Sequence, residues 1–190
     1  MPTKPDDDSA AAELAQRVSV TSYDASWPEQ YERERPCILS ALGPLALEVE
    51  HIGSTSVRGL DAKPTIDILV GAHSLEIPES VIGRMAEIGY EYRGEMGVPG
   101  RRYFRKAHRY PRSFNVHVAI WRGQLWNDNL AFRDYLRDHP ERARAYADLK
   151  RQILTSTDGA TLEGYSAGKA SFIAETVRRA HRLPPPLHGE

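Results

Sequence analysis

The residues best suited to chemistry in this sequence are the small-residue segment Gly53-Ser54-Thr55-Ser56 and the acid Asp67 that follows it. Glycine permits backbone angles that point consecutive N–H groups into one concavity, and the Ser54 hydroxyl adds a donor there. A helical turn beginning at Ser54 would add the positive end of its dipole. These features predict a phosphate-binding turn, with a capped strand-to-helix turn as the plain structural alternative.

Asp67 is the single charged residue of the apolar run Thr65–Val70. A carboxylate within such a strand costs several kcal/mol to desolvate unless a cation or a hydrogen-bond donor meets it. The alternative is a position at the exposed end of the strand. As a hard oxygen donor, Asp67 is a candidate ligand for Mg²⁺.

Three further residues are candidates for metal binding or proton transfer beside Asp67. His117 alternates with Val116 and Val118, which places it on the opposite face of its strand, and a hydrogen-bonded structural histidine is the alternative. Glu50 and His51 directly precede the glycine-serine turn. We expect them to face the same space or else the solvent.

No acidic residue occurs between Met96 and Asn127, a segment that contains seven basic residues: Arg101, Arg102, Arg105, Lys106, Arg109, Arg112 and Arg122. Such a run is either a solvated face or a patch for an anionic ligand. Arg102 and Lys106 share strand parity with Phe104, so we predict that both reach one ligand.

Tyr165 and Lys169 are four residues apart and therefore lie on one face of a predicted helix. That face is mostly apolar. A lysine there either extends to solvent or meets an anion.

Hydrophobic spacing and turn residues predict the elements that position these side chains. Helices are expected over residues 26–43, 80–88, 130–139, 140–155 and 162–181, with Pro36 interrupting or kinking the first. Strands are expected over residues 17–21, 45–52, 65–70, 90–93, 102–106 and 114–120. The order predicts an α+β or α/β fold with a mixed sheet, flanking helices and a helical C-terminal portion.

The composition is that of a globular protein, with 41% apolar and 27% charged residues in a chain of 190. With 25 basic and 26 acidic residues the net charge is -1, so no global field attracts nucleic acid or an anionic membrane. A nucleic acid would have to bind the basic run at residues 101–112. Cys37 is the single cysteine, which excludes an internal disulfide and favours a cytoplasmic location.

We expect one domain over residues 16–183, between a frayed tail at residues 1–15 and a loose tail at residues 184–190. The start lacks the pattern of a signal peptide, and no run approaches the roughly 18 apolar residues of a membrane span. No membrane partner is expected. The oligomeric state is left open.

Several motifs together resemble a known family. They are Tyr23-Asp24-x-x-Trp27-Pro28, Glu50-His51-Ile52-Gly53-Ser54-Thr55-Ser56-Val57-x-Gly59-Leu60-x-Ala62-Lys63-Pro64-x-Ile66-Asp67-Ile68, His117-Val118, Phe132-Arg133-Asp134-Tyr135-Leu136-Arg137, and Tyr165 with Lys169. From about Val18 to Ala180 the sequence resembles the GrpB family, which is placed in the nucleotidyltransferase superfamily and is also found fused to dephospho-CoA kinase.

The resemblance implies a nucleotidyltransferase-like mixed sheet in which Gly53 and Ser54 bind nucleotide phosphates and Asp67 binds Mg²⁺. Such enzymes usually carry a second acid two residues later, where this chain has Leu69, and a third on a later strand, where it has His117. Two of the three expected carboxylates are missing. Glu50 or a ligand phosphate would have to complete a site for one metal ion.

Two positions depart from the usual family block, where Pro and Ala are expected and this chain has Arg58 and Asp61. They are expected either to tune ligand choice or to form an exposed ion pair.

Two functions follow as hypotheses. The first is Mg²⁺-dependent transfer of a nucleotidyl group from a nucleoside triphosphate to a small acceptor. Its residues would be Asp67 for the metal, His117, Glu50 and His51 for proton transfer or metal binding, and Gly53, Ser54, Ser56, Lys63, Arg102, Lys106, Tyr165 and Lys169 for the phosphates and the rest of the ligand. The second is a non-catalytic module that binds a nucleotide, a CoA precursor or another phosphorylated small molecule.

Overall fold

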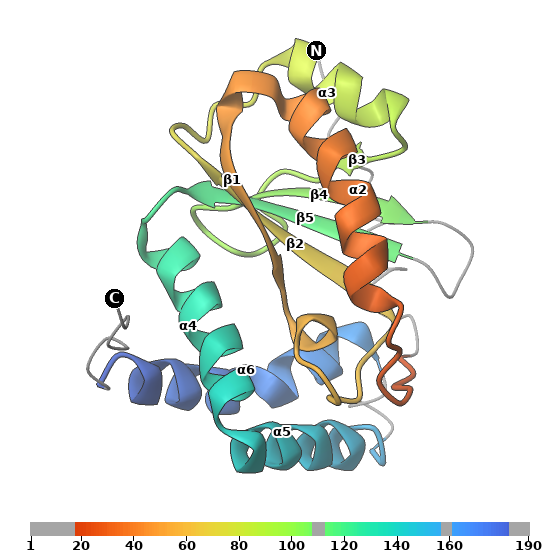
Figure 1. Cartoon of the computed structure of the whole chain (residues 1–190), viewed down its shortest axis with the longest axis vertical. Helices are drawn as coiled ribbons and strands as arrows, with labels where there is room; N and C mark the ends of the chain where they lie inside the picture. Colours follow the sequence, from red (N-terminus) through yellow and green to blue (C-terminus); the bar gives the residue numbers. More distant parts are fainter. Residues whose placement is uncertain (1–17, 108–112, 157–160, 183–190) are drawn as a thin grey trace.

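The centre of the fold is a five-stranded mixed sheet with the strand order β1-β2-β5-β4-β3 (Figure 1). The computed structural model describes residues 18–107, 113–156 and 161–182. Its strands are β1 (Ala46–Ile52), β2 (Thr65–Ala72), β3 (Glu91–Tyr92), β4 (Arg102–Ala107) and β5 (Ser113–Ile120). β2 and β5 are parallel, whereas the other neighbours pair antiparallel.

One face of the sheet is covered by α2 (Trp27–Leu42) and α3 (Glu79–Glu87). Alternate residues of the central strands point into this core, among them Ile66, Ile68, Val116 and Val118. This alternation sends the intervening residues to the other face. α2 runs through Pro36 without a break, so the predicted interruption there is wrong.

The other face is approached by α4 (Gln124–Asp138), which packs Trp126 against Leu69 and Ala119. Gly71 makes this approach possible, because a Cβ atom there would lie 2.6 Å from Trp121 and 2.9 Å from Trp126. α4 therefore crosses the sheet at Gly71 and leaves the Asp67 end of β2 to other elements.

α5 (Pro140–Ile153) and α6 (Leu162–Ala180) complete a helical layer with α4, as Figure 1 shows. This layer has its own apolar cluster, which includes Val57 and Leu60 from the loop after β1. That loop contains the 3₁₀ turn η2 (Ser54–Ser56), and a second turn, η1 (Gly43–Leu45), joins α2 to β1. The glycine-serine turn is thus held between the sheet and the helical layer.

The predicted α+β fold with a mixed sheet and a helical C-terminal portion is confirmed. The expected strand at residues 17–21 is wrong in its described part, where Thr21 forms only an isolated bridge with Ala62. The tails expected at residues 1–15 and 184–190 lie outside the described residues. Among the described helices, none has the length and apolar character needed to cross a membrane.

Candidate functional site

Asp67 and His117 meet on the face of the sheet opposite α2 and α3. The parallel register places Asp67 beside Asn115 and Leu69 beside His117. Asn115 Nδ2 donates to Asp67 Oδ1 at 2.8 Å, and His117 Nε2 lies 3.4 Å from the same oxygen. The Asp67 carboxylate is therefore met by protein donors, in agreement with the desolvation argument.

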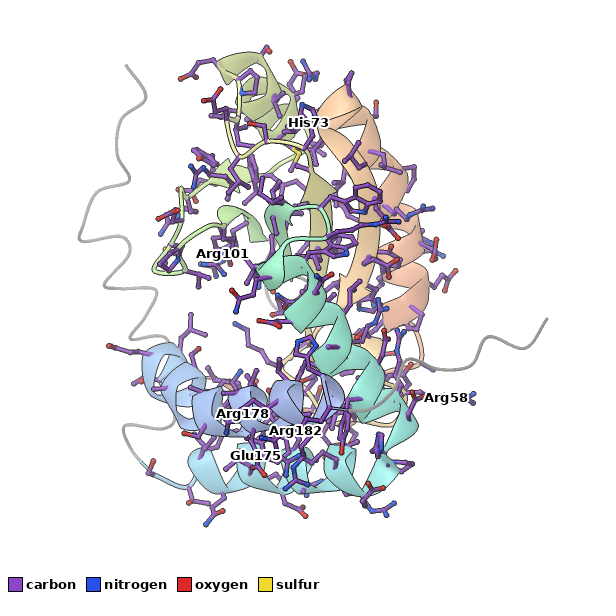
Figure 2. All side chains as sticks on the ribbon, turned by 90° about the vertical axis from the view of Figure 1, so that its left-hand side faces the viewer. Arg58, His73, Arg101, Glu175, Arg178 and Arg182 are labelled. Carbon is purple, nitrogen blue, oxygen red and sulfur yellow. The ribbon has the colours of Figure 1, made fainter. Side chains whose placement is uncertain are left out.

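Arg101 fixes the orientation of the His117 ring. Its Nη1 lies 3.1 Å from His117 Nδ1, and its guanidinium also donates to the backbone oxygens of Glu95 and Met96. A guanidinium has only donors, so Nδ1 must accept and the ring proton lies on Nε2, facing Asp67. Figure 2 shows Arg101 at the side of the molecule where the sheet faces α6.

The pKa of Asp67 lies below its ordinary value. Burial alone would raise this pKa, but hydrogen bonds from His117 and Asn115 and the positive charge of Lys63 outweigh it. Tyr103 supports the arrangement, because its hydroxyl donates to Asn115 Oδ1 at 2.8 Å and so turns the amide N–H toward Asp67. The site thus holds a carboxylate that is charged at neutral pH.

Gly53 brings the predicted phosphate-binding turn directly against this carboxylate. A Cβ atom at position 53 would lie 2.6 Å from Asp67 Oδ2. The backbone at Gly53 has φ 70° and ψ -173°, a region that is open essentially to glycine alone. Glycine is therefore required twice, for its conformation and for its missing side chain.

Lys150 faces the other side of the turn and is fully buried, with 0% of its surface exposed. Its Nζ donates to Ser54 Oγ at 3.1 Å and to the backbone oxygen of Asp61, and it lies over the Tyr146 ring. Burial lowers the pKa of Lys150 to about 7, and the nearby charge of Lys169 contributes.

Lys169 comes from α6 and lies over the Tyr165 ring, 4.1 Å from its centroid. Burial lowers the pKa of Lys169 to about 8, Asp67 opposes this shift and Lys63 adds to it. Within the described part of the chain, neither Lys150 nor Lys169 forms a salt bridge with a carboxylate. The turn, Asp67 and these lysines form what we call the cradle: Gly53, Ser54, Lys63, Asp67, Lys150 and Lys169.

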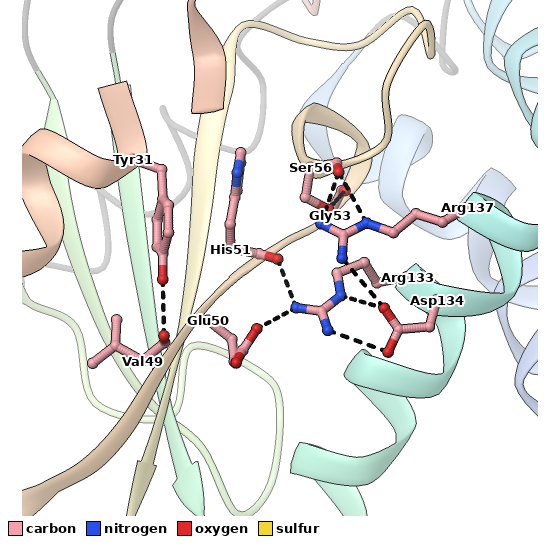
Figure 3. Close-up of polar contacts among 9 residues, drawn as sticks. All are labelled: Tyr31, Val49, Glu50, His51, Gly53, Ser56, Arg133, Asp134 and Arg137. Carbon is pink, nitrogen blue, oxygen red and sulfur yellow. Dashed lines mark hydrogen bonds and ion pairs between the residues drawn. The ribbon is translucent and has the colours of Figure 1, made fainter. Parts of the chain in front are cut away.

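Arg133 of α4 anchors β1 just before the turn, as Figure 3 shows. Its guanidinium donates to the Glu50 carboxylate, to the backbone oxygen of His51 and to the neighbouring Asp134. Glu50 is therefore tied to α4 and not to Asp67. Its predicted part in a metal site is not supported by this geometry.

Arg137, one turn further along α4, holds the end of η2. Its Nε and Nη2 both donate to the Ser56 backbone oxygen, at 3.2 and 3.0 Å (Figure 3). The Ser56 hydroxyl donates to the Gly53 oxygen at 2.6 Å, so it closes the turn instead of facing a ligand. We call Glu50, Arg133, Asp134 and Arg137 the clamp.

His51 points to the other face of the sheet, beneath α2. Its ring stacks on Tyr31, and its Nε2 lies 3.0 Å from Thr55 Oγ1. Burial lowers the pKa of His51 to about 4, so the ring is neutral at pH 7. His51 therefore lies on the other face of the sheet from Asp67 and bonds within the chain, and its predicted catalytic role stays a prediction.

Arg102 and Lys106 also lie on the α2 and α3 face of the sheet. Lys106 Nζ pairs with Glu34 of α2 at 2.6 Å, and Arg102 donates to Glu95 and to the Leu75 oxygen. The predicted parity with Phe104 is correct, but that residue points into the main core. The two side chains are therefore not brought to the cradle, which corrects that prediction.

Two loop predictions also have clear outcomes. Asp61 pairs with Arg151 at 2.7 Å and not with Arg58, so the expected ion pair has a different partner. In the basic run, residues 108–112 lie outside the described residues. The described Arg101, Arg102 and Lys106 all bond to groups of this chain.

The side chains at the cradle do not fit a resident two-metal centre. Among the described residues, no group of three His, Cys, Asp or Glu side chains is placed to hold a metal ion. Leu69, at the position of the usual second acid, is fully buried against Trp126. A single carboxylate surrounded by lysines lacks the oxygen ligands that a protein cage for Mg²⁺ needs.

Sequence reasoning missed Lys150, Tyr146, Asn115 and Tyr103. Asn115 could have been found, because it shares strand parity with His117. Lys150 carries no local signal, since its neighbours Asp148 and Arg151 make it look like one more residue of a solvated helix.

Comparisons with known proteins agree on one family. The family model described as GrpB protein matches residues 17–179. UPF0157 protein YqkA of Bacillus subtilis is 35% identical over 166 residues, which cover 87% of this chain and 48% of that protein. UPF0157 protein SCO7215 of Streptomyces coelicolor is 36% identical over 87% of this chain and 86% of its own length.

A solved structure described as conserved protein GrpB from Enterococcus faecalis is 39% identical, with a TM-score of 0.76 over 85% of this chain and 96% of that chain. A dephospho-CoA kinase of Mycolicibacterium paratuberculosis is 27% identical over 86% of this chain and 46% of its own length. This chain thus spans about half the length of the kinase and of the Bacillus subtilis relative.

Proposed function

The chain belongs to the GrpB family, and from this premise we propose that it binds a nucleotide or a CoA precursor at the cradle without needing a resident metal ion. The observation that carries the proposal is Lys150, a fully buried lysine beside Lys169 and Ser54. Two neighbouring ammonium groups, of which Lys150 is fully buried and Lys169 partly buried, repel each other and are costly to desolvate. A phosphate group between them would offset both costs.

The chemistry of the cradle favours a nucleotide-like ligand over free phosphate. Lys150, Lys169 and the Ser54 hydroxyl offer donors to phosphate oxygens. Asp67 offers an acceptor on the same side of the turn, which a ribose hydroxyl or an amino group can meet. A ligand that carries both phosphate and hydroxyl groups satisfies the two kinds of partner together.

A thermal-stability panel tests this proposal. ATP, GTP, CTP, UTP and dephospho-CoA are each added to the full chain with Mg²⁺ or with EDTA. A ligand at one hundred times its Kd should add about 2.7 kcal/mol of stability. We expect at least one ligand to stabilise the protein in EDTA, and the absence of any stabilisation would overturn the proposal.

Variants locate the ligand. Lys169→Met should weaken binding at least tenfold. Arg102→Ala is the matched control, since Arg102 is a basic residue of the site first predicted but lies on the other face of the sheet. Equal affinities in the two variants would place the ligand elsewhere.

Nucleotidyl transfer is a second candidate function, favoured by the contact between Gly53 and Asp67. A charged carboxylate against the phosphate-binding turn is placed to meet Mg²⁺ that arrives bound to a nucleoside triphosphate. The test is the release of pyrophosphate from each nucleoside triphosphate with Mg²⁺ and a panel of small hydroxyl and amine acceptors. Release that Asp67→Asn abolishes would support an enzyme, and release that this variant leaves unchanged would reject the role of Asp67.

A further inference from the structure

A separate pocket of about 540 Å³ lies on the outer side of the loop at residues 57–61, between this loop and helices α4 and α5. It shares Arg137 with the clamp and no residue with the cradle. Asp61 forms the wall between pocket and cradle, because its backbone oxygen accepts from Lys150 while its carboxylate pairs with Arg151 on the pocket side. The volume lies within the range of small-molecule sites.

The floor of this pocket is apolar. Val57, Leu60, Leu136 and Ala147 line it, and all four belong to the apolar cluster of the helical layer. The pocket therefore opens onto the edge of that core. These four residues are themselves buried, so the gain for a hydrocarbon chain or ring placed against them comes mainly from the removal of its own apolar surface from water.

At the rim of the pocket, basic side chains outnumber acidic ones. Four arginines, Arg58, Arg137, Arg144 and Arg151, line the pocket against two acids, Asp61 and Asp148, which both pair with Arg151. Arg58 and Arg144 are exposed and form no hydrogen bond or ion pair with any residue that the structure describes. Figure 2 shows Arg58 on the opposite side of α4 from Arg101, the residue that contacts His117.

We propose that this pocket binds an amphipathic anion, with its apolar part on the floor and its carboxylate or phosphate at Arg58 and Arg144. Guanidinium groups bind either head group through paired hydrogen bonds. An apolar ligand without charge would leave the rim unused. A small anion without an apolar part would make no contact with the floor.

Titration calorimetry on the full chain tests the proposal with four probes: octyl phosphate, octanoate, octanol and inorganic phosphate. We expect octyl phosphate, octanoate or both to bind saturably and at least ten times more tightly than octanol and inorganic phosphate. The two charged probes distinguish a phosphate from a carboxylate ligand. Affinities no better than that of octanol would overturn the proposal.

Two variants place the probe in the pocket. Ala147→Trp fills the floor and should abolish binding, and Arg144→Ala, which removes an exposed side chain, should weaken binding about tenfold. Arg178→Ala is the control, an exposed arginine on α6 away from the pocket. Binding that Arg144→Ala leaves unchanged would contradict the proposal even where Ala147→Trp does not fold.

Lys169→Met separates this pocket from the cradle. It should weaken nucleotide binding at least tenfold and leave the affinity for octyl phosphate unchanged. Loss of octyl phosphate binding in this variant would mean that the probe occupies the cradle, which overturns the inference without touching the proposed function.

Discussion

The cradle and the clamp lie on two sides of the same turn and differ in whether their basic side chains are paired with acids. In the clamp, Arg133 and Arg137 are matched by Glu50, Asp134 and backbone oxygens. In the cradle, Lys150 and Lys169 form no described salt bridge, and burial lowers their pKa. Charges that are balanced within the chain hold a structure together, whereas lysines that have lowered pKa values and form no salt bridge indicate a place for a ligand.

The largest expected effect comes from Gly53→Ala, which disturbs both regions at once. The new methyl group would meet Asp67 Oδ2, and the backbone would adopt a conformation that alanine avoids. We expect a loss of about 3 kcal/mol of unfolding free energy, measured by urea denaturation. Gly59→Ala is the control, because φ is +79° there but no atom lies within 4 Å of the added Cβ. Equal losses at both positions would show that the contact with Asp67 does not matter.

The second largest effect tests the clamp. Arg133→Met should cost about 2 kcal/mol, because it leaves the partly buried Glu50 carboxylate without its partner. A double-mutant cycle with Glu50→Gln isolates their interaction. If the two losses simply add, Arg133 and Glu50 are not coupled and the clamp is not a structural unit.

Lys150→Met should have the opposite sign. It removes a buried charge that lacks a described carboxylate partner, so stability at pH 6 should rise by roughly 1 to 2 kcal/mol. Phosphate-ligand affinity should fall at least tenfold in the same variant. A variant that is less stable than the parent chain would place Lys150 among the structural residues, like those of the clamp.

The smallest effect is the pH dependence of the cradle. The lowered pKa values of Lys150 and Lys169, about 7 and 8, mean that these groups lose protons just above neutrality. An anion binds their protonated forms, so the complex holds more protons and affinity falls as pH rises. We expect at least a tenfold weakening between pH 6.5 and 8.5 by calorimetry. A flat profile would mean that the lysines do not contact the ligand.

Sequence patterns predicted all five strands of the sheet, but around Asp67 they predicted only His117 and the glycine-serine turn and not Asn115 or Tyr103. Alternation with Val116 and Val118 placed His117 on the correct face, and the Gly-Ser pair marked the turn. The same parity argument failed for Lys106, because it does not say which face the helices cover. The apolar residue Phe104, which is fully buried, could have indicated that Arg102 and Lys106 lie on the core-facing side of their strand.

Lys150 shows what sequence patterns could not supply. Its burial depends on the packing of α5 against a loop about ninety residues earlier, where Lys150 contacts Asp61. No periodicity within α5 distinguishes such a lysine from a solvated one. Similarly, the motif on α4 contained Arg133 and Arg137, but the sequence did not indicate that Arg133 binds Glu50 on β1.

The long sequence separations in the cradle have a consequence for folding kinetics. Lys150 and Ser54 are 96 residues apart, twice the 48 residues that separate Asp67 from Asn115, its pairing partner within the sheet. Contacts between such distant residues close slowly, so the cradle is expected to form after the sheet and its α2 and α3 core. A ligand that binds only the finished cradle should therefore slow unfolding and leave the folding rate nearly unchanged.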